Sequence, residues 1–236
     1  MQVYGISDKG KTRNKNEDRI FYTDKPIGKL PNLFIVADGV GGTIAGEIAS
    51  SFATEKFCQC IIENKDDDSP LEILAKGIVE VNKYIHYKST NSYEFQGMAT
   101  TFLAATIIND KIYAINIGDC RLYLLSKNTI TQITEDNSYY NEMKNILEIE
   151  TLKINKNILS RAVGQLGSLN VDTYEVEYTK DTNVIMCSDG LYKMLGDIEI
   201  LDIYNTTQDV KSYINLLIKE ANQKGGQDNI SVIGIG

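Results

Sequence analysis

Four aspartates of this 236-residue chain share a local context that favours metal chemistry. Each stands at the end of an apolar run or in a glycine-rich turn: Asp38, Asp119, Asp189 and Asp228. Glycine neighbours let the backbone approach a ligand closely and leave carbonyl oxygens accessible. Oxygen donors without imidazole or thiolate suit Mg²⁺ or Mn²⁺ rather than zinc or copper. Any one of these aspartates alone could be a turn former or a helix cap, and the spacing does not decide whether the four converge.

The stretch over residues 34–42 gives the clearest form of this pattern. Its apolar run predicts a buried strand that ends at Asp38 and is followed by glycines. Thr43 comes next and is placed to cap a helix. Two cations a few ångströms apart can share one carboxylate and hold a water between them. The stretch therefore predicts that Asp38 meets something small and positive.

Arg13 is a candidate for binding phosphate. It lies in a basic loop over residues 8–16, four residues before Glu17 and Asp18. Beside a pair of metal ions, a guanidinium would clamp a phosphoryl group because it binds two oxygens at once. The pattern alone favours a solvated basic loop, so the assignment depends on where the loop lies.

The single histidine, His86, limits the other chemistries open to the chain. It excludes zinc sites that need two or three imidazoles and leaves a serine–histidine–aspartate triad only one candidate base. Its position on an amphipathic helical stretch favours an ordinary surface residue. The cysteines, expected to be free cytoplasmic thiols, are Cys58, Cys60, Cys120 and Cys187. None has an arginine six residues later, so the loop of the cysteine-dependent phosphatases is absent.

Composition argues against two classes of partner. The net charge is −8, which disfavours nucleic acid and anionic membranes. No apolar stretch approaches the roughly 20 residues of a membrane span, and no signal peptide is visible. We expect a cytoplasmic protein.

The order of the elements predicts an α+β fold in one domain over residues 1–236. Strands are expected at residues 3–7, 19–23, 32–37, 100–108, 111–117, 121–126, 129–133, 171–178, 183–187 and 230–235. Helices are expected at residues 43–64, 71–88, 198–204 and 207–222. Ser69 is the expected cap of the second helix, with Pro70 at its first position. Strands in runs and helices in pairs predict two mainly antiparallel sheets covered by helices.

Seven short motifs follow one another in register over nearly the whole chain. They are RNKNEDR (13–19), VADGVGG (36–42), GMATT (97–101), IGDCRLY (117–123), NILSRAVG (157–164), CSDGL (187–191) and GQDNI (226–230). In this order they resemble the PPM (PP2C-type) family of metal-dependent protein serine/threonine phosphatases, in its compact bacterial form. The resemblance implies a four-layer αββα sandwich.

The resemblance also implies a metal site with Mn²⁺ or Mg²⁺. Asp38 would bridge two ions, with the carbonyl of Gly39 on one of them. Asp189 and Asp228 would bind the other ion. Asp18 would hold the second metal through water, and Asp119, together with Asp189, would hold a third and weaker ion.

The implied reaction is hydrolysis of phosphoserine and phosphothreonine by a hydroxide that bridges the metals, without a phospho-enzyme intermediate. Arg13 would bind the phosphate. Two departures stand out. Val40 replaces the histidine that eukaryotic members carry after the Asp-Gly pair, so a water must protonate the leaving group, and the flap over residues 137–157 looks short.

The implied partners are phosphorylated proteins that are substrates of a bacterial Ser/Thr kinase, and the chain is expected to be a monomer. Two alternatives remain open, a phosphoprotein-binding regulator without catalysis and a hydrolase of small phosphoesters. Arg121 and Arg161 are interpreted as members of structural ion pairs.

Overall fold

The computed structural model describes residues 1–40, 44–144, 155, 158–179 and 181–236. Within these residues the strands form two sheets, and every strand pairing is antiparallel. The first sheet has the order β1 (Val3–Asp8), β11 (Ile230–Ile235), β10 (Asn183–Cys187), β7 (Arg121–Ser126) and β8 (Thr129–Gln132). The second has the order β2 (Asp18–Thr23), β3 (Leu33–Val40), β5 (Phe102–Ile108), β6 (Lys111–Ile117) and β9 (Asp172–Glu177), with β4 (Ala99–Thr100) also paired to β3.

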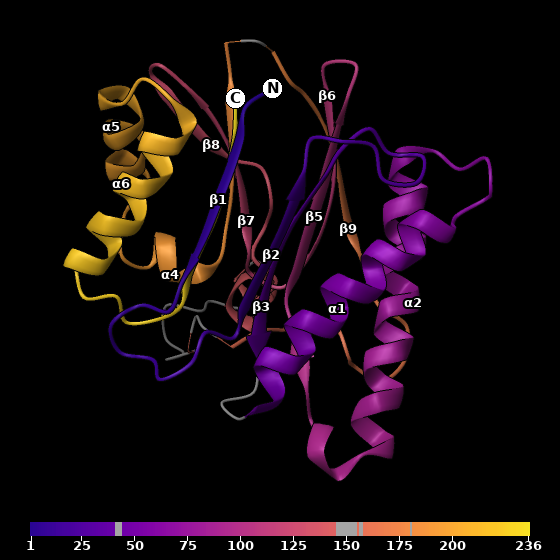
Figure 1. Ribbon diagram of the computed structural model, residues 1–236. Coiled ribbons are helices and arrows are strands. Elements are labelled where there is room, and N and C mark those ends of the chain that lie inside the picture. Colours follow the sequence, from indigo (N-terminus) through magenta and orange to yellow (C-terminus); the bar gives the residue numbers. More distant parts are fainter. Residues whose placement is uncertain (41–43, 145–154, 156–157, 180) are drawn as a thin grey trace.

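Helices cover the outer face of each sheet, so the described chain has the layer order helix, sheet, sheet, helix (Figure 1). The second sheet carries α1 (Ile44–Glu63) and α2 (Pro70–Asn91), and the first carries α4 (Asp189–Tyr192), α5 (Asp197–Thr206) and α6 (Val210–Gln223). A short 3₁₀ turn, η1 (Tyr93–Phe95), follows α2, and a short helix, α3 (Tyr139–Met143), follows β8. The predicted α+β sandwich is therefore confirmed.

Each interface between layers has its own apolar core. One cluster joins α1 and α2 to the second sheet, one joins the first sheet to α4, α5 and α6, and one lies between the sheets. On α1 the residues that face the sheet recur every four positions and are fully buried or nearly so: Ala45, Ala49, Ala53, Phe57 and Ile61. This spacing places them on one helix face, and the alanines at its start allow close approach to β3.

The boundaries differ from the predicted ones where a local feature overrides the apolar pattern. The strand expected over 100–108 is two strands, β4 and β5. The helix expected from residue 207 begins at Val210, because Asp209 accepts a hydrogen bond from the backbone of Ser212 and caps it. Helix α4 was not predicted. The predicted cap Ser69, with Pro70 at the start of the helix, is confirmed, and Glu72 completes a capping box with Ser69.

The expected cap Thr43 and most of the flap over residues 137–157 lie outside the described residues. No helix in the described part of the chain combines the length and apolar character needed to span a membrane.

Candidate metal and phosphate site

The predicted carboxylates converge on one pocket of about 620 Å³ at the end of the two sheets. Asp38 and Gly39 reach it from β3, Asp119 from the turn after β6, and Asp189 from the start of α4. Other residues that line it are Arg13, Glu17, Val40, Thr101, Ile158, Leu159, Lys193 and Asp228. The tertiary structure thus brings together side chains that are up to 215 positions apart in the sequence, as Arg13 and Asp228 are.

Asp18 and Asp38 face each other across the β2–β3 ladder. They are partners in the antiparallel register, so their side chains leave the same face of the sheet. Asp18 Oδ2 accepts a hydrogen bond of 2.7 Å from Ser188 Oγ, which ties this sheet to the start of α4. Asp18 Oδ1 is buried and has no hydrogen-bond partner among the described residues.

The end of β3 is held by its backbone. The Asp38 N–H donates to Thr101 Oγ1 at 2.9 Å, and the Asp38 carbonyl accepts from the Thr101 N–H at 2.8 Å and from Thr100 Oγ1 at 2.9 Å. The Gly39 N–H donates to the Glu17 carbonyl at 3.1 Å. A Cβ atom on Gly39 would overlap the Gly46 carbonyl of α1. Only glycine lets α1 pack this closely.

Asp119 and Asp189 lie on facing turns. Gly118, before Asp119, has a φ of 106°, a conformation that favours glycine. Asp189 is the first residue of α4, and a Cβ on Gly190 would overlap the Asn229 carbonyl. Asp189 Oδ2 forms an ion pair with Lys193 one helical turn later, whereas Asp189 Oδ1 is buried without a hydrogen-bond partner among the described residues.

Arg13 reaches the pocket because its loop is fastened to the turn before β11. Arg13 Nη2 pairs with Asp228 Oδ2 at 2.8 Å. The side-chain amide of Asn229 donates to the carbonyls of Lys9 and Lys15, each at 2.8 Å, and its oxygen accepts from the Glu17 N–H at 2.9 Å. The basic loop is therefore anchored at both ends.

The pocket is strongly acidic. Burial raises the pKa of Asp38 well above its ordinary value, and the charges of Asp18, Asp189 and Asp119 raise it further. Burial likewise raises the pKa of Asp18 to about 7 and the pKa of Asp119 to about 6. Like charges held together out of water stabilise protonated forms unless a cation is present. A divalent ion would supply that charge.

The donor set fits a hard divalent cation. The available atoms are carboxylate and carbonyl oxygens, and two carboxylate oxygens are buried without a hydrogen-bond partner in the described residues. As the side chains stand, no three aspartate, glutamate, histidine or cysteine side chains of the described residues are grouped around one point as ligands. Asp189 and Asp228 are instead engaged by Lys193 and Arg13.

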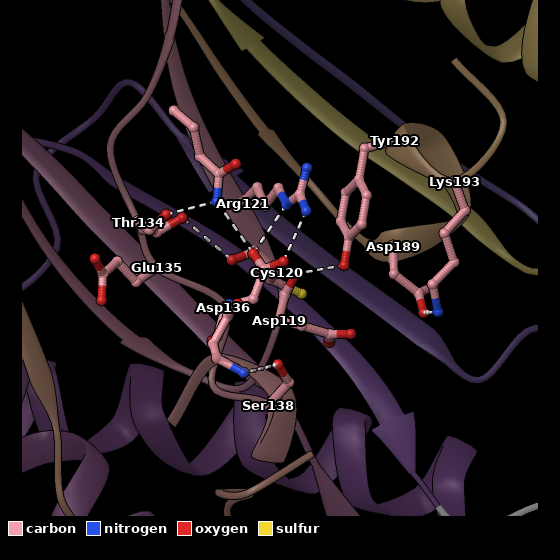
Figure 2. A network of polar contacts seen from close by, with 12 residues as sticks. Asp119, Cys120, Arg121, Thr134, Glu135, Asp136, Ser138, Asp189, Tyr192 and Lys193 are labelled. Carbon is pink, nitrogen blue, oxygen red and sulfur yellow. Dashed lines mark hydrogen bonds and ion pairs between the residues drawn. The ribbon is translucent and has the colours of Figure 1, made fainter. Parts of the chain in front are cut away.

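Both arginines expected to make structural ion pairs do so. Arg121 Nε and Nη2 donate to the two carboxylate oxygens of Asp136 at 2.9 and 2.7 Å. The guanidinium of Arg121 lies 3.5 Å from the centre of the Tyr192 ring, and the Tyr192 hydroxyl donates to the Asp119 carbonyl at 3.0 Å (Figure 2). Arg161 pairs with Asp172 at 2.6 Å.

Histidine and cysteine chemistry is not built into this site. His86 is half-buried rather than on the surface, because its Nδ1 lies 3.2 Å from the Gly164 carbonyl on a neighbouring loop. It is not among the described residues that line the pocket. The four cysteines are free. Burial raises the pKa of the Cys120 thiol well above its ordinary value and also raises that of Cys187, so neither is a thiolate at neutral pH.

Sequence reasoning missed several residues that hold the site. Thr101, Ser188 and Asn229 lie inside the quoted motifs, but their hydrogen bonds depend on strands that are distant in sequence. Lys193, which also lines the pocket, is another such residue. The spacing of four residues between Asp189 and Lys193 on a helix was the signal that could have revealed the pair.

Comparison with known proteins gives consistent matches. The chain matches the protein phosphatase 2C family over residues 10–231. It is 36% identical to a serine/threonine phosphatase stp of Listeria welshimeri, over 96% of this chain and 92% of that protein. Its fold is similar to the Streptococcus agalactiae serine/threonine phosphatase (TM-score 0.87, 27% identity, 99% and 98% of the two chains). It also resembles the serine/threonine phosphatase Stp1 of Staphylococcus aureus (TM-score 0.89, 23% identity, 100% and 94%).

Proposed function

The chain belongs to the protein phosphatase 2C family, and we propose that it hydrolyses phosphoserine and phosphothreonine in proteins with the help of Mn²⁺ or Mg²⁺. The observation that carries the proposal is the pocket in which Asp38, Asp119, Asp189 and Asp228 meet Arg13. Acidic oxygen donors beside a guanidinium suit a site that holds cations and a phosphoryl group together.

The assignment of ligands follows the position of each carboxylate. Asp38, whose charge is repelled by those of Asp18, Asp189 and Asp119, would be the ligand shared by two ions, and the Gly39 carbonyl would be a ligand of one of them. Asp189 and Asp228 would be ligands of the other ion, and Asp18 would act through a water. Ions held by these residues would lower the pKa of the attacking water and offset charge on the phosphoryl oxygens. No phospho-enzyme intermediate is required.

Arg13 binds the phosphate. Its side chain is 45% exposed and pairs with Asp228 at the mouth of the pocket, so it reaches substrate without crossing the protein. When Asp228 binds a cation, the guanidinium is released to make two hydrogen bonds to phosphate oxygens. The residues that hold the loop, Asn229 in particular, fix the direction from which Arg13 approaches.

The leaving group is protonated by water rather than by an imidazole. Val40, which lines the pocket next to Gly39, has no proton to donate, and His86 lies outside the lining. We expect His86→Gln to leave the pH dependence of kcat/KM unchanged. A lost or shifted limb of that pH profile would show that the imidazole takes part.

The decisive experiment is hydrolysis of a phosphothreonine peptide by the purified chain. We expect turnover with Mn²⁺, none after EDTA treatment, full recovery when Mn²⁺ is restored, and no effect of iodoacetamide because the mechanism uses no thiol. Asp38→Asn should be inactive, with Asp24→Asn, on an exposed bend, as the matched control. Turnover that survives EDTA or Asp38→Asn would refute the proposal.

The same assay separates the two alternatives. A regulator without catalysis would bind the peptide without releasing phosphate. A hydrolase of small phosphoesters would turn over p-nitrophenyl phosphate but not the phosphopeptide. The four aspartates predicted to bind metal directly all line the pocket, which favours catalysis over binding alone: Asp38, Asp119, Asp189 and Asp228.

We further propose that the chain acts in the cytoplasm as a monomer and opposes a bacterial Ser/Thr kinase. The relatives named serine/threonine phosphatases come from bacteria, which supports this setting. Residues 1–236 act as one catalytic unit, because the site draws on both sheets and the sheets share an apolar core. A phosphoproteome comparison of cells that carry the wild type or Asp38→Asn would identify the substrates.

A further inference from the structure

Lys193 is a basic side chain of the pocket to which the proposed reaction assigns no role. It follows Asp189 by one helical turn at the end of α4, and its ammonium forms an ion pair with Asp189 Oδ2 (Figure 2). Its side chain is 31% exposed, so the pair is partly removed from water. Ion pairs near the surface contribute little to stability. The Lys193–Asp189 pair is notable instead for its position, because Asp189 is a predicted metal ligand.

The two oxygens of Asp189 have different surroundings. Oδ2 is taken by the Lys193 ammonium, whereas Oδ1 is buried and has no hydrogen-bond partner among the described residues. A carboxylate can bind a metal through one oxygen and accept a charged donor at the other. Asp189 therefore has one oxygen without a protein partner, which a core ion could use, while its other oxygen is paired with the Lys193 ammonium.

Asp119 lies within the field of the same ammonium. Its side chain points toward the Asp189–Lys193 pair (Figure 2), and each residue's charge affects the other: Lys193 lowers the pKa of Asp119, and Asp119 raises that of Lys193. Burial alone lowers the pKa of Lys193, but Asp189 and Asp119 outweigh it and raise the pKa above its ordinary value. The lysine remains charged.

The position of α4 relative to Asp119 is fixed. The Tyr192 hydroxyl donates to the Asp119 carbonyl at 3.0 Å, and the Tyr192 ring is covered by the Arg121 guanidinium. Tyr192 stands between Asp189 and Lys193 in the sequence of α4. The contact therefore holds the helix that carries the ammonium against the turn that carries Asp119.

We propose that the Lys193 ammonium is a built-in cation that takes the place of a third metal ion at Asp119 and Asp189, so that the chain binds two divalent ions. The inference rests on the proposed function for the two core ions. It replaces the third ion that the sequence predicts at Asp119 and Asp189 with the Lys193 ammonium, which is paired with Asp189.

The test counts bound Mn²⁺ without substrate, by electron paramagnetic resonance titration and by native mass spectrometry. Wild type should bind two ions per chain. Lys193→Met keeps the length of the side chain and removes its charge, and should bind a third ion at least tenfold more tightly than wild type does. Lys193→Arg should behave as wild type. Lys193→Met combined with Asp119→Asn should return to two ions.

The matched control is Lys83→Met. Lys83 pairs with Glu80 on the exposed face of α2, so the variant removes a comparable helical ion pair far from the pocket and should bind two ions. A third ion bound equally well by wild type and Lys193→Met, or no added ion in Lys193→Met, would overturn the inference.

Because the count is made without substrate, its failure is distinct from failure of the proposed function. A protein that hydrolyses the phosphopeptide but binds three ions with Lys193 intact refutes only the role of Lys193. A protein that binds two ions, gains a third in Lys193→Met and hydrolyses no phosphopeptide refutes only the proposed reaction.

Discussion

Single residues of the pocket illustrate how burial and charge act against each other. Asp18 and Asp119 are less than 10% exposed, and each has a raised pKa because burial, together with neighbouring carboxylates, outweighs the groups that favour the ionised form. The hydrogen bond from Ser188 favours the ionised form of Asp18 but does not outweigh burial. Such residues cost stability unless a cation binds, and this is expected of a site kept for function.

Asp38→Asn should separate folding from metal binding. The amide has the same shape as the carboxylate but carries no charge, so repulsion with Asp18, Asp189 and Asp119 is relieved. Without metal we expect the variant to be at least as stable as wild type in urea unfolding. Mn²⁺ should no longer stabilise it, and phosphopeptide turnover should fall by about 10²–10³-fold or more. A variant that unfolds early without metal would assign Asp38 a structural role.

Arg13→Met should affect substrate binding and turnover but not folding. The Arg13 side chain is 45% exposed and forms an ion pair with Asp228, so loss of the guanidinium changes the free energy of unfolding little. We expect kcat/KM for the phosphopeptide to fall by about 10²-fold because two charge-assisted hydrogen bonds to phosphate are lost. Lys11→Met in the same loop is the control. Equal effects of the two substitutions would show that the loop acts only through its overall charge.

At the level of elements, the site depends on turns and short segments rather than on long helices. The β3–β4 pairing places Thr100 and Thr101 against Asp38. Helix α4 has only four residues, yet it carries Asp189 and Tyr192. Its place is secured by contacts made outside the helix, above all the contact of Tyr192 with Arg121. These contacts explain why a short helix can hold a ligand firmly.

Arg121→Met tests this support. The substitution removes two hydrogen bonds to Asp136 and one to the Tyr123 hydroxyl. It also removes the cation–π contact between the guanidinium and the Tyr192 ring. Asp136 then loses its cation while 16% exposed, and we expect a loss of about 2–4 kcal/mol in the free energy of unfolding.

The control for this variant is Lys111→Met, which breaks the exposed pair with Glu175 and should cost less than about 0.5 kcal/mol. Urea unfolding at one pH measures both. Similar losses in the two variants would show that Arg121 contributes no more than a surface charge.

The whole molecule is a sandwich whose two sheets pack face to face over a shared apolar core. The N–H of Gln2 donates to the Gly236 carbonyl at 2.6 Å beside the β1–β11 pair of the first sheet. The end of β3 and the start of α4, which carry Asp38 and Asp189, lie at the opposite end of the sandwich from the two chain ends (Figure 1). Repulsion among the buried carboxylates there is an electrostatic strain that the apolar cores offset.

The pH dependence of stability should reveal this strain. Carboxyl groups with raised pKa bind protons more tightly in the folded than in the unfolded state, so folding is favoured at low pH. The metal-free protein should lose stability as pH rises from about 5 to 7.5, where Asp119 (pKa about 6) and Asp18 (pKa about 7) lose their protons.

Thermal unfolding with EDTA or Mn²⁺ at pH 5.5 and 7.5 provides the measurement. Mn²⁺ should raise Tm more at pH 7.5, because the ionised carboxylates bind it, and each kcal/mol corresponds to roughly 2–4 °C. Asp18→Asn combined with Asp119→Asn should flatten the dependence. A Tm rise of equal size at both pH values would show that these carboxyls do not control metal binding.

The fold class and the candidate carboxylates could be predicted from the sequence because they depend on local patterns. A buried strand such as β3 is continuous in apolar residues, and its end is marked by Asp38 and Gly39. Element boundaries were less predictable at β4 and at α4, because a strand of two residues and a helix of four are defined by their neighbours and not by periodicity.

By itself, the sequence determined which residue types stand at the strand ends, and with them the preference for hard cations. The tertiary structure alone decided which of these groups share a pocket and which basic side chain meets which carboxylate. Lys193 shows the difference: its spacing from Asp189 is local, but its effect on Asp119 depends on two turns brought together from opposite parts of the chain. The physical reason is that charges act through space and burial, both of which are set by packing rather than by position in the sequence.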